Sequence, residues 1–214
     1  MLVKNRMTPN PITITTDTPI ADALDWMRRE KVHRFPVVDK EDKLLGIVSH
    51  TDLLYASPSP VTSLNVWEIT YLLNKVKVKE TMTKDVITVE EDCPIEDAAR
   101  LMNDNNIGGL PVIRDEVVVG IITESDIFKT FLELMMARDK GVRLTALAPN
   151  FKGSLAQISS TITEQGGLIL ALNTFLGEDP TNWGCHLKVA DISKDKLIEI
   201  IKPLVVKIMD VRDI

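Results

Sequence analysis

The chain has 214 residues, of which 44% are hydrophobic and 26% charged, and its formal net charge is −6. At about 100–200 residues per domain this length suits one or two domains, and the composition is that of a soluble globule rather than a disordered chain. The acidic balance argues against a general nucleic-acid binder, because such proteins gather Lys and Arg on the surface that meets phosphates.

Cysteine and histidine usage limits the possible chemistry. Cys93 and Cys185 are the two cysteines of the sequence, too few for a disulfide framework or a zinc site. His33, His50 and His186 lie far apart without paired ligand spacing, so we expect no metal. The sequence has no apolar segment of signal-peptide type and no run of about 20 apolar residues. We therefore expect a cytoplasmic protein with no membrane partner.

The first two thirds of the sequence contain two copies of one unit. Matched residues recur at a spacing of 75, which becomes 74 after one deletion. Seven identical residues and one Ser/Thr pair over about fifty residues indicate a real duplication. The matched pairs are Met7 and Met82, Thr8 and Thr83, Pro19 and Pro94, Pro36-Val37 and Pro111-Val112, Gly46 and Gly120, Ser49 and Thr123, and Asp52 and Asp126.

Each copy predicts the order strand, helix, strand, strand, helix. β-Branched runs predict the first strands, and a proline in the first turn with apolar residues on one face predicts the helix that follows. Pro-Val runs and their apolar partners predict a hairpin, and an aspartate marks the start of the last helix. The expected strands are 12–15, 36–38 and 45–49 in the first copy and 86–89, 111–113 and 117–123 in the second, with last helices from Asp52 and Asp126.

This order resembles CBS repeats, which work as pairs. The resemblance rests on Met-Thr at the start, Pro-Val in the middle and Gly-Ile-(Val/Ile)-(Ser/Thr)-x-x-Asp at the end, and it covers about residues 1–137. It implies an adenosine compound, such as AMP, ADP, ATP or S-adenosylmethionine, in the cleft between the repeats. We expect the first repeat at 1–56, a helical linker at 57–78 and the second repeat at 79–140.

The resemblance also implies roles for matching residues. Asp52 and Asp126 would accept hydrogen bonds from ribose hydroxyls, for which a carboxylate is suited because it only accepts. Alternatively, both aspartates only cap helices. The loops before the prolines would read the adenine edge, with isoleucines over the base. The full expected set is Ile12, His33, Arg34, Phe35, Ser49, His50, Asp52, Ile87, Gly108, Gly109, Leu110, Thr123 and Asp126.

The two copies differ in charge around these motifs. The first has His33, Arg34 and His50, where the second has Gly108, Gly109 and Glu124. Phosphates require positive charge or free backbone N–H groups. We therefore predict that the pocket lined by Arg34 holds the phosphates.

An apolar stretch at 61–73 separates the copies and predicts a buried helix. Trp67 is expected to anchor a homodimer interface, with a place in the core as the alternative. The preceding residues 57–60, Ser-Pro-Ser-Pro, predict a turn.

Residues 142–214 predict a split βαβ order, typical of a ferredoxin-like sandwich. The loop 149–153 and the following residues resemble an ACT domain, which implies effector binding near Asn150, Gly153, Ser154 and Leu155. Residue chemistry alone also explains this loop, because Asn150 favours a turn and Ser154 is suited to cap the helix. A dimerisation module that binds no effector stays possible.

The expected fold is therefore α/β (α+β), a CBS pair followed by a ferredoxin-like βαββαβ ACT-like domain. This arrangement resembles the acetoin-utilisation protein B type, a bacterial regulatory family. It implies a non-enzymatic sensor that forms a homodimer and regulates an enzyme partner. The alternatives are a small enzyme or enzyme subunit acting on an adenosyl compound, and an interaction scaffold without a ligand. A transcription factor is disfavoured because no basic helix-turn-helix is left unassigned.

Overall fold

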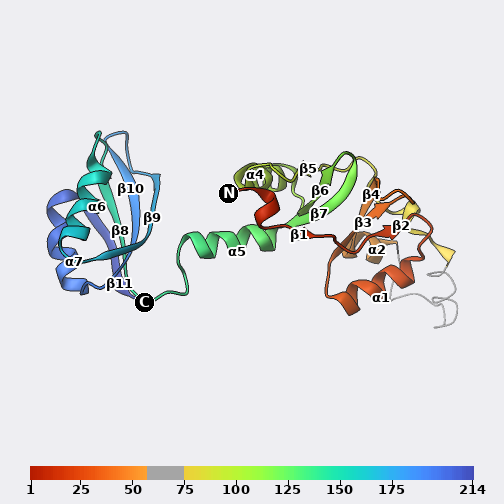
Figure 1. Cartoon of the computed structure of the whole chain (residues 1–214), viewed down its shortest axis with the longest axis horizontal. Coiled ribbons are helices and arrows are strands. Elements are labelled where there is room, and N and C mark those ends of the chain that lie inside the picture. The colour runs from red at the N-terminus through yellow and green to blue at the C-terminus, as the bar shows by residue number, and fades with distance from the viewer. Residues whose placement is uncertain (57–74) are drawn as a thin grey trace. The chain divides into compact units, whose positions relative to one another are not determined.

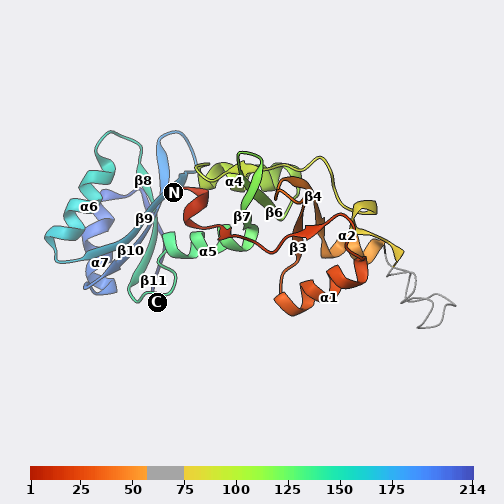
Figure 2. The ribbon, with the colours of Figure 1, turned by 45° about the vertical axis from the view of Figure 1, so that its right-hand side comes forward.

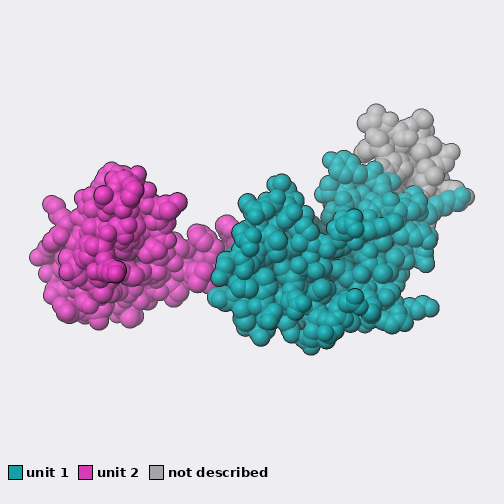
Figure 3. Space-filling model, turned by 90° about the horizontal axis from the view of Figure 1, so that it is seen from above, with its two compact units in different colours: residues 1–127 teal, residues 128–214 magenta. Residues whose placement is uncertain are grey.

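The computed structural model describes residues 1–56 and 75–214. It divides into two compact units, residues 1–127 and 128–214 (Figure 3). Most of the predicted linker, with Trp67, lies outside the described residues. No described helix is long and apolar enough to cross a membrane.

The predicted order of elements occurs twice within residues 1–134, so the last helix of the second copy begins in the first unit and ends beyond Ile127 (Figure 1). The first strand of each repeat is shorter than predicted, because only two residues pair with the next strand. These are Ile14 and Thr15 in the first repeat and Val89 and Glu90 in the second, where the strand ends one residue beyond the predicted range 86–89. The first repeat comprises β2 (Ile14–Thr15), α1 (Ile20–Glu30), β3 (Arg34–Val38), β4 (Leu44–Ser49) and α2 (His50–Tyr55), and the second comprises β5 (Val89–Glu90), α4 (Ile95–Asn105), β6 (Gly109–Arg114), β7 (Val117–Thr123) and α5 (Glu124–Leu134).

The helices that follow the first strands are amphipathic, as predicted. In α1, Ile20, Ala23 and Met27 are buried on one face, and α4 buries the corresponding face. Both helices end at a residue in the left-handed conformation, Lys31 with φ 55° and Asn106 with φ 53°. The two copies therefore share local geometry even where the residue type differs.

The start of each repeat packs on the other repeat. Strand β1 (Thr8–Pro9) pairs antiparallel with β7 of the second repeat (Figures 1 and 2). Reciprocally, Thr83 and Ile47 of the first repeat exchange two backbone hydrogen bonds of 2.9 Å. Val3 is fully buried in the core of the second repeat, and Val78 in that of the first. The two repeats thus exchange their first segments.

The second unit has the predicted βαββαβ order, with an antiparallel sheet β11-β8-β10-β9. Helices α6 and α7 lie on one face of this sheet (Figures 1 and 2), where residues such as Leu144, Ile158 and Leu197 form a buried core. The elements are β8 (Val142–Pro149), α6 (Ser154–Glu164), β9 (Leu168–Leu176), β10 (Asn182–Ala190), α7 (Lys194–Ile201), η3 (Lys202–Leu204) and β11 (Lys207–Asp213).

Polar side chains on β10 are buried in this unit as well. His186 is 5% exposed and Lys188 is 3% exposed. The Lys188 ammonium donates a 2.7 Å hydrogen bond to the carbonyl oxygen of Met136, and the Asn173 amide contacts the Met135 sulfur at 3.4 Å. The segment that follows α5 therefore supplies partners to polar side chains of the sheet.

Candidate functional site

A cavity of about 610 Å³ lies in the first unit and is lined by both repeats. The second repeat contributes its first residues and the loop before β6, while the first contributes the start of β3, the end of β4 and the start of α2. The cavity brings together the expected residues His33, Arg34, Ser49, His50, Asp52, Ile87, Gly108 and Gly109.

At the centre of this cavity Asp52 is held by Ser49. The Asp52 carboxylate oxygen Oδ2 accepts hydrogen bonds from Ser49 N at 2.8 Å and Ser49 Oγ at 2.6 Å. Ser49 Oγ in turn accepts from Asp52 N at 3.2 Å, which caps α2. Among the described residues none donates a hydrogen bond to Oδ1 of Asp52. The capping geometry therefore positions one carboxylate oxygen and leaves the other as an acceptor.

Arg34 reaches from β3 to the loop of the second repeat. A β-carbon on Gly108 would lie 2.6 Å from Nη2 of Arg34 and 3.1 Å from Oε2 of Glu124. Burial lowers the pKa of Arg34, and the negative charges of Glu124 and Asp52 act in the opposite direction. The guanidinium remains a cation at neutral pH and is the permanent positive charge of the cavity wall.

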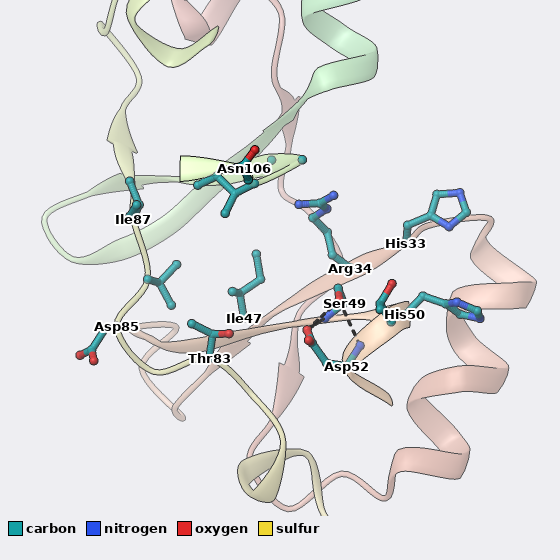
Figure 4. Close-up of a pocket in the computed structure, with 15 residues that line it drawn as sticks. His33, Arg34, Ile47, Ser49, His50, Asp52, Thr83, Asp85, Ile87 and Asn106 are labelled. Carbon is teal, nitrogen blue, oxygen red and sulfur yellow. Dashed lines mark hydrogen bonds between the residues drawn. The ribbon is translucent and has the colours of Figure 1, made fainter. Parts of the chain in front are cut away.

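The labelled side chains follow an order across the cavity (Figure 4). Thr83, Asp85 and Ile87 lie at one end, Ser49, Asp52 and Arg34 lie in the middle, and His33 and His50 lie at the other end. Both histidine rings point away from the Ile87 end. One end of the cavity therefore combines the apolar Ile87 with a polar and an acidic side chain, the middle holds the guanidinium, and the other end carries the two imidazole rings.

Five expected residues do not line this cavity: Ile12, Phe35, Leu110, Thr123 and Asp126. Phe35 and Leu110 are 1% and 0% exposed, with side chains in the two cores. Their side chains therefore pack the repeats. In the second repeat, Asp126 Oδ2 accepts from Thr123 N at 3.1 Å and Thr123 Oγ1 at 2.7 Å, which repeats the Ser49 and Asp52 arrangement.

Sequence reasoning missed several lining residues. Thr83 belongs to the repeated Met-Thr pair, so its place beside the exchanged segment had a sequence signal. Asn106 had no sequence signal, because it reaches the cavity through the left-handed turn that ends α4. The missed residues are Ile47, Thr51, Thr83, Asp85, Val86, Asn106 and Ile107.

The expected effector residues of the second unit surround the start of α6. Gly153 and Leu155 line a cavity of about 600 Å³ with Phe151, Phe175 and Trp183. The expectation that Ser154 caps α6 is wrong, because Gly153 occupies that position with φ 98°. Ser154 Oγ is instead buried, with no hydrogen-bond partner among the described residues. Asn150 donates through Nδ2 to the Pro180 carbonyl at 3.0 Å.

Within residues 1–56 and 75–214, no group of three or more His, Cys, Asp or Glu side chains is placed to hold a metal ion.

Comparison with known proteins identifies the first unit. The model of the CBS domain family matches residues 3–59 and 78–133, more than half of the chain. A CBS domain-containing protein of Dictyostelium discoideum is 34% identical over 63% of this chain and 94% of its own length. Inosine-5′-monophosphate dehydrogenase of Methanocaldococcus jannaschii is 37% identical over 64% of this chain, but the match spans only 25% of that enzyme.

Solved structures give the same result. The CBS domain pair of protein MJ0100, in complex with 5′-methylthioadenosine and S-adenosyl-L-methionine, has a TM-score of 0.52 and 33% identity, covering 61% of this chain and 95% of that one. A putative acetoin utilization protein from Vibrio cholerae has a TM-score of 0.54 and 33% identity, covering 64% and 95%. CBSX2 in complex with AMP has a TM-score of 0.51 and 31% identity, covering 62% and 97%.

Proposed function

The chain belongs to the CBS domain family, and we propose that it is a non-enzymatic regulatory protein that binds an adenine nucleotide or a related adenosyl compound between its repeats. The observation that carries this proposal is the ordered cavity, in which Asp52, with one free carboxylate oxygen, and Arg34 lie between an end with Ile87 and an end with two histidines. Relatives bound to AMP, S-adenosyl-L-methionine and 5′-methylthioadenosine support the same ligand class.

The cavity suggests one orientation of the ligand. Adenine lies near Ile87 and Ile47, the ribose hydroxyls donate to Asp52, and phosphate lies toward Arg34. The loop at Gly108 and Gly109 allows close approach because it carries no side chains. For the equivalent residues Ile12, Thr123 and Asp126 we propose a second, less basic adenosyl position.

The remaining domain assignments belong to this proposal. We assign residues 1–56 and 79–140 to the two repeats and 142–214 to an ACT-like domain. Its βαββαβ order and the cavity beside Gly153 support this assignment. The buried Ser154 hydroxyl, for which the described part of the chain offers no hydrogen-bond partner, favours a small effector with a hydrogen-bonding group near the start of α6. In this proposal the protein is a cytoplasmic homodimer that regulates an enzyme partner, as in the acetoin-utilisation type.

The first experiment asks which ligand the purified protein carries. Mass spectrometry of small molecules released from fresh protein should find an adenosyl compound, and thermal unfolding should rise with AMP, ADP, ATP or S-adenosylmethionine. A ligand at about 100 times its dissociation constant adds about 2.7 kcal/mol to stability. No released compound and no thermal shift would contradict the proposal, and turnover of the nucleotide would replace it with an enzymatic function.

The second experiment tests the orientation of the ligand. Arg34→Ala should weaken AMP binding while leaving adenosine binding unchanged, because the guanidinium meets only the phosphate. Arg29→Ala is the matched control, since Arg29 is exposed on α1 and does not line the cavity. Equal weakening of AMP and adenosine would show that Arg34 supports the fold of the site instead.

A further inference from the structure

A second cavity of about 430 Å³ adjoins the first across a shared wall. His33 and His50 line both cavities. Their backbones are joined, because His50 N donates a 2.8 Å hydrogen bond to the His33 carbonyl. Beyond them lies the second cavity, which we call the tail groove. Its other lining residues are Leu24, Met27 and Arg28 of α1, Lys31 and Val32 of the turn that follows, and Leu54 of α2.

The tail groove collects positive charge on a chain whose net charge is −6. Arg28, Lys31, His33 and His50 line it, and no Asp or Glu does. Arg28 and Lys31 form no ion pair with any described residue. Basic residues in the last turn of a helix also offset its dipole. That effect accounts for Arg28 but not for its convergence on one cavity with His33, from the turn after α1, and His50, from the start of α2.

The second repeat lacks every one of these basic residues. At the repeat spacing of 75, Asn103 corresponds to Arg28 and Asn106 to Lys31. Gly108 corresponds to His33 and, at a spacing of 74, Glu124 corresponds to His50. Because Lys31 and Asn106 share the same left-handed geometry, the change concerns chemistry and not local fold. The positive groove is a property of the first repeat alone.

The direction of the first cavity leads toward this groove. Ile87 lies at one end, Asp52 and Arg34 lie together in the middle, and His33 and His50 lie at the other end, so a phosphate bound at Arg34 has the histidines on the side away from Ile87 (Figure 4). The histidine rings point away from the Ile87 end, toward the side that they share with the tail groove. Further phosphates of a longer nucleotide would continue in that direction.

We propose that the tail groove binds the β- and γ-phosphates of a nucleoside di- or triphosphate whose nucleoside occupies the first cavity. This inference rests on the proposed function and adds to it a means of distinguishing ATP from AMP. Arg28 and Lys31 supply the charges, and His33 and His50 donate hydrogen bonds along the path. The triphosphate therefore binds more tightly than the monophosphate.

The test compares AMP, ATP and inorganic tripolyphosphate by calorimetry, without divalent cations, on the full chain and on the Arg28→Gln/Lys31→Gln variant. ATP should bind the variant about three- to tenfold more weakly, since each exposed charge contribution is small and two are lost. AMP affinity should stay unchanged. Arg29→Gln is the matched control and should change neither, because Arg29 lies outside the groove. Unchanged thermal unfolding of the apo variant confirms its fold.

Two results would overturn this inference while leaving the proposed nucleotide function intact. In the first, the variant binds AMP and shows no selective loss of ATP affinity. In the second, the wild-type chain binds tripolyphosphate as tightly as ATP. The second result would assign the groove to free polyphosphate. If the wild-type chain binds neither AMP nor ATP, the proposed nucleotide function fails, and the tail groove fails with it.

Discussion

Gly46 of β4 lies against the side chain of Met82, with no room for a β-carbon between them. A β-carbon at position 46 would lie 2.7 Å from the Met82 sulfur and 2.8 Å from the Thr83 carbonyl oxygen. In the other repeat Gly120 faces Met7 in the same way. The repeated Met-Thr and Gly motifs, which lie far apart in the sequence of each repeat, therefore meet across the two repeats.

This contact predicts different outcomes for two equivalent substitutions. Gly46→Ala and Gly120→Ala should each lower the free energy of unfolding by about 1–3 kcal/mol through overpacking. In Gly120→Ala the added β-carbon meets only the flexible Met7 side chain. In Gly46→Ala it meets a backbone carbonyl oxygen as well as the Met82 side chain. Adding Met7→Ala should therefore relieve most of the strain of Gly120→Ala, while adding Met82→Ala should relieve less of that of Gly46→Ala.

Two double-mutant cycles test this prediction by chemical denaturation. Each cycle compares a glycine variant, the matching methionine variant and the double variant with the wild-type chain. Equal coupling energies in the two cycles would show that the Thr83 carbonyl moves away without cost.

Asp52→Asn should separate ligand binding from helix capping. The amide oxygen can still accept from Ser49 N, so we expect a stability loss below about 1 kcal/mol, within the usual range of cap substitutions. AMP binding should weaken by about 1.5–3 kcal/mol, the contribution of hydrogen bonds to charged groups. Ser49→Ala should lower stability clearly, because the helix cap is lost, and should weaken AMP binding less than Asp52→Asn does. Calorimetry and thermal unfolding on both variants measure the two effects, and a purely structural Asp52 would leave AMP affinity unchanged.

The two cysteines should differ in reactivity. Burial raises the pKa of Cys185 to about 11, and the thiol has no exposed surface. Burial and the nearby Asp97 also raise the pKa of Cys93, but its side chain is only partly buried. At pH 8 Ellman's reagent should label Cys93 slowly in the native protein and both thiols in denaturant. Cys93→Ser should abolish native labelling and Cys185→Ser should not; the opposite pattern would contradict the burial of β10.

The second unit should lose stability as the pH falls below about 6.5. Burial lowers the pKa of His186, the positive charges of Arg143 and Lys188 lower it further, and Asp210 acts in the opposite direction. The unfolded chain therefore takes up a proton near its ordinary pKa of about 6.5, while the folded chain resists protonation. Stability is complete above that pH and declines toward the lower, folded pKa.

Hydrogen exchange of the β10 amides between pH 7 and 5, corrected for intrinsic exchange, measures this decline for the second unit alone. His186→Gln should reduce the pH dependence, and His33→Gln, which alters the other unit, should not. If the stability of His186→Gln depends on pH as strongly as that of the wild-type chain, the loss of stability at low pH comes from other titratable groups.

The duplication made most of the first unit predictable. The amphipathic faces of α1 and α4 and the Pro-Val hairpins follow from local periodicity, which two copies display twice. Ser49 and Asp52 were identified because their motif recurs. The strand exchange was not predicted, because pairing between Ile47 and Thr83 depends on which sheet the chain reaches and not on local residue preference.

In the second unit the order of elements was predictable, whereas the start of α6 was not. Ser154 has the chemistry of a cap, but the left-handed conformation of Gly153 places it one position later, with a buried hydroxyl. The groove beside Arg28 and Lys31 also escaped prediction, since it is formed by residues of two helices, α1 and α2, and of the turn that follows α1.

The reciprocal exchange of first segments has a consequence for the ancestry of the molecule. A lone copy of the unit would lack the strand and the buried valine that its neighbour supplies, as β1 and Val3 do for the second repeat. Such a copy would be complete only as a swapped pair of identical chains, so gene fusion of that pair is the simplest origin of the present architecture. Fusion then freed each half to change by itself, and the first half carries Arg28, Lys31, His33 and His50 where the second has two asparagines, a glycine and a glutamate.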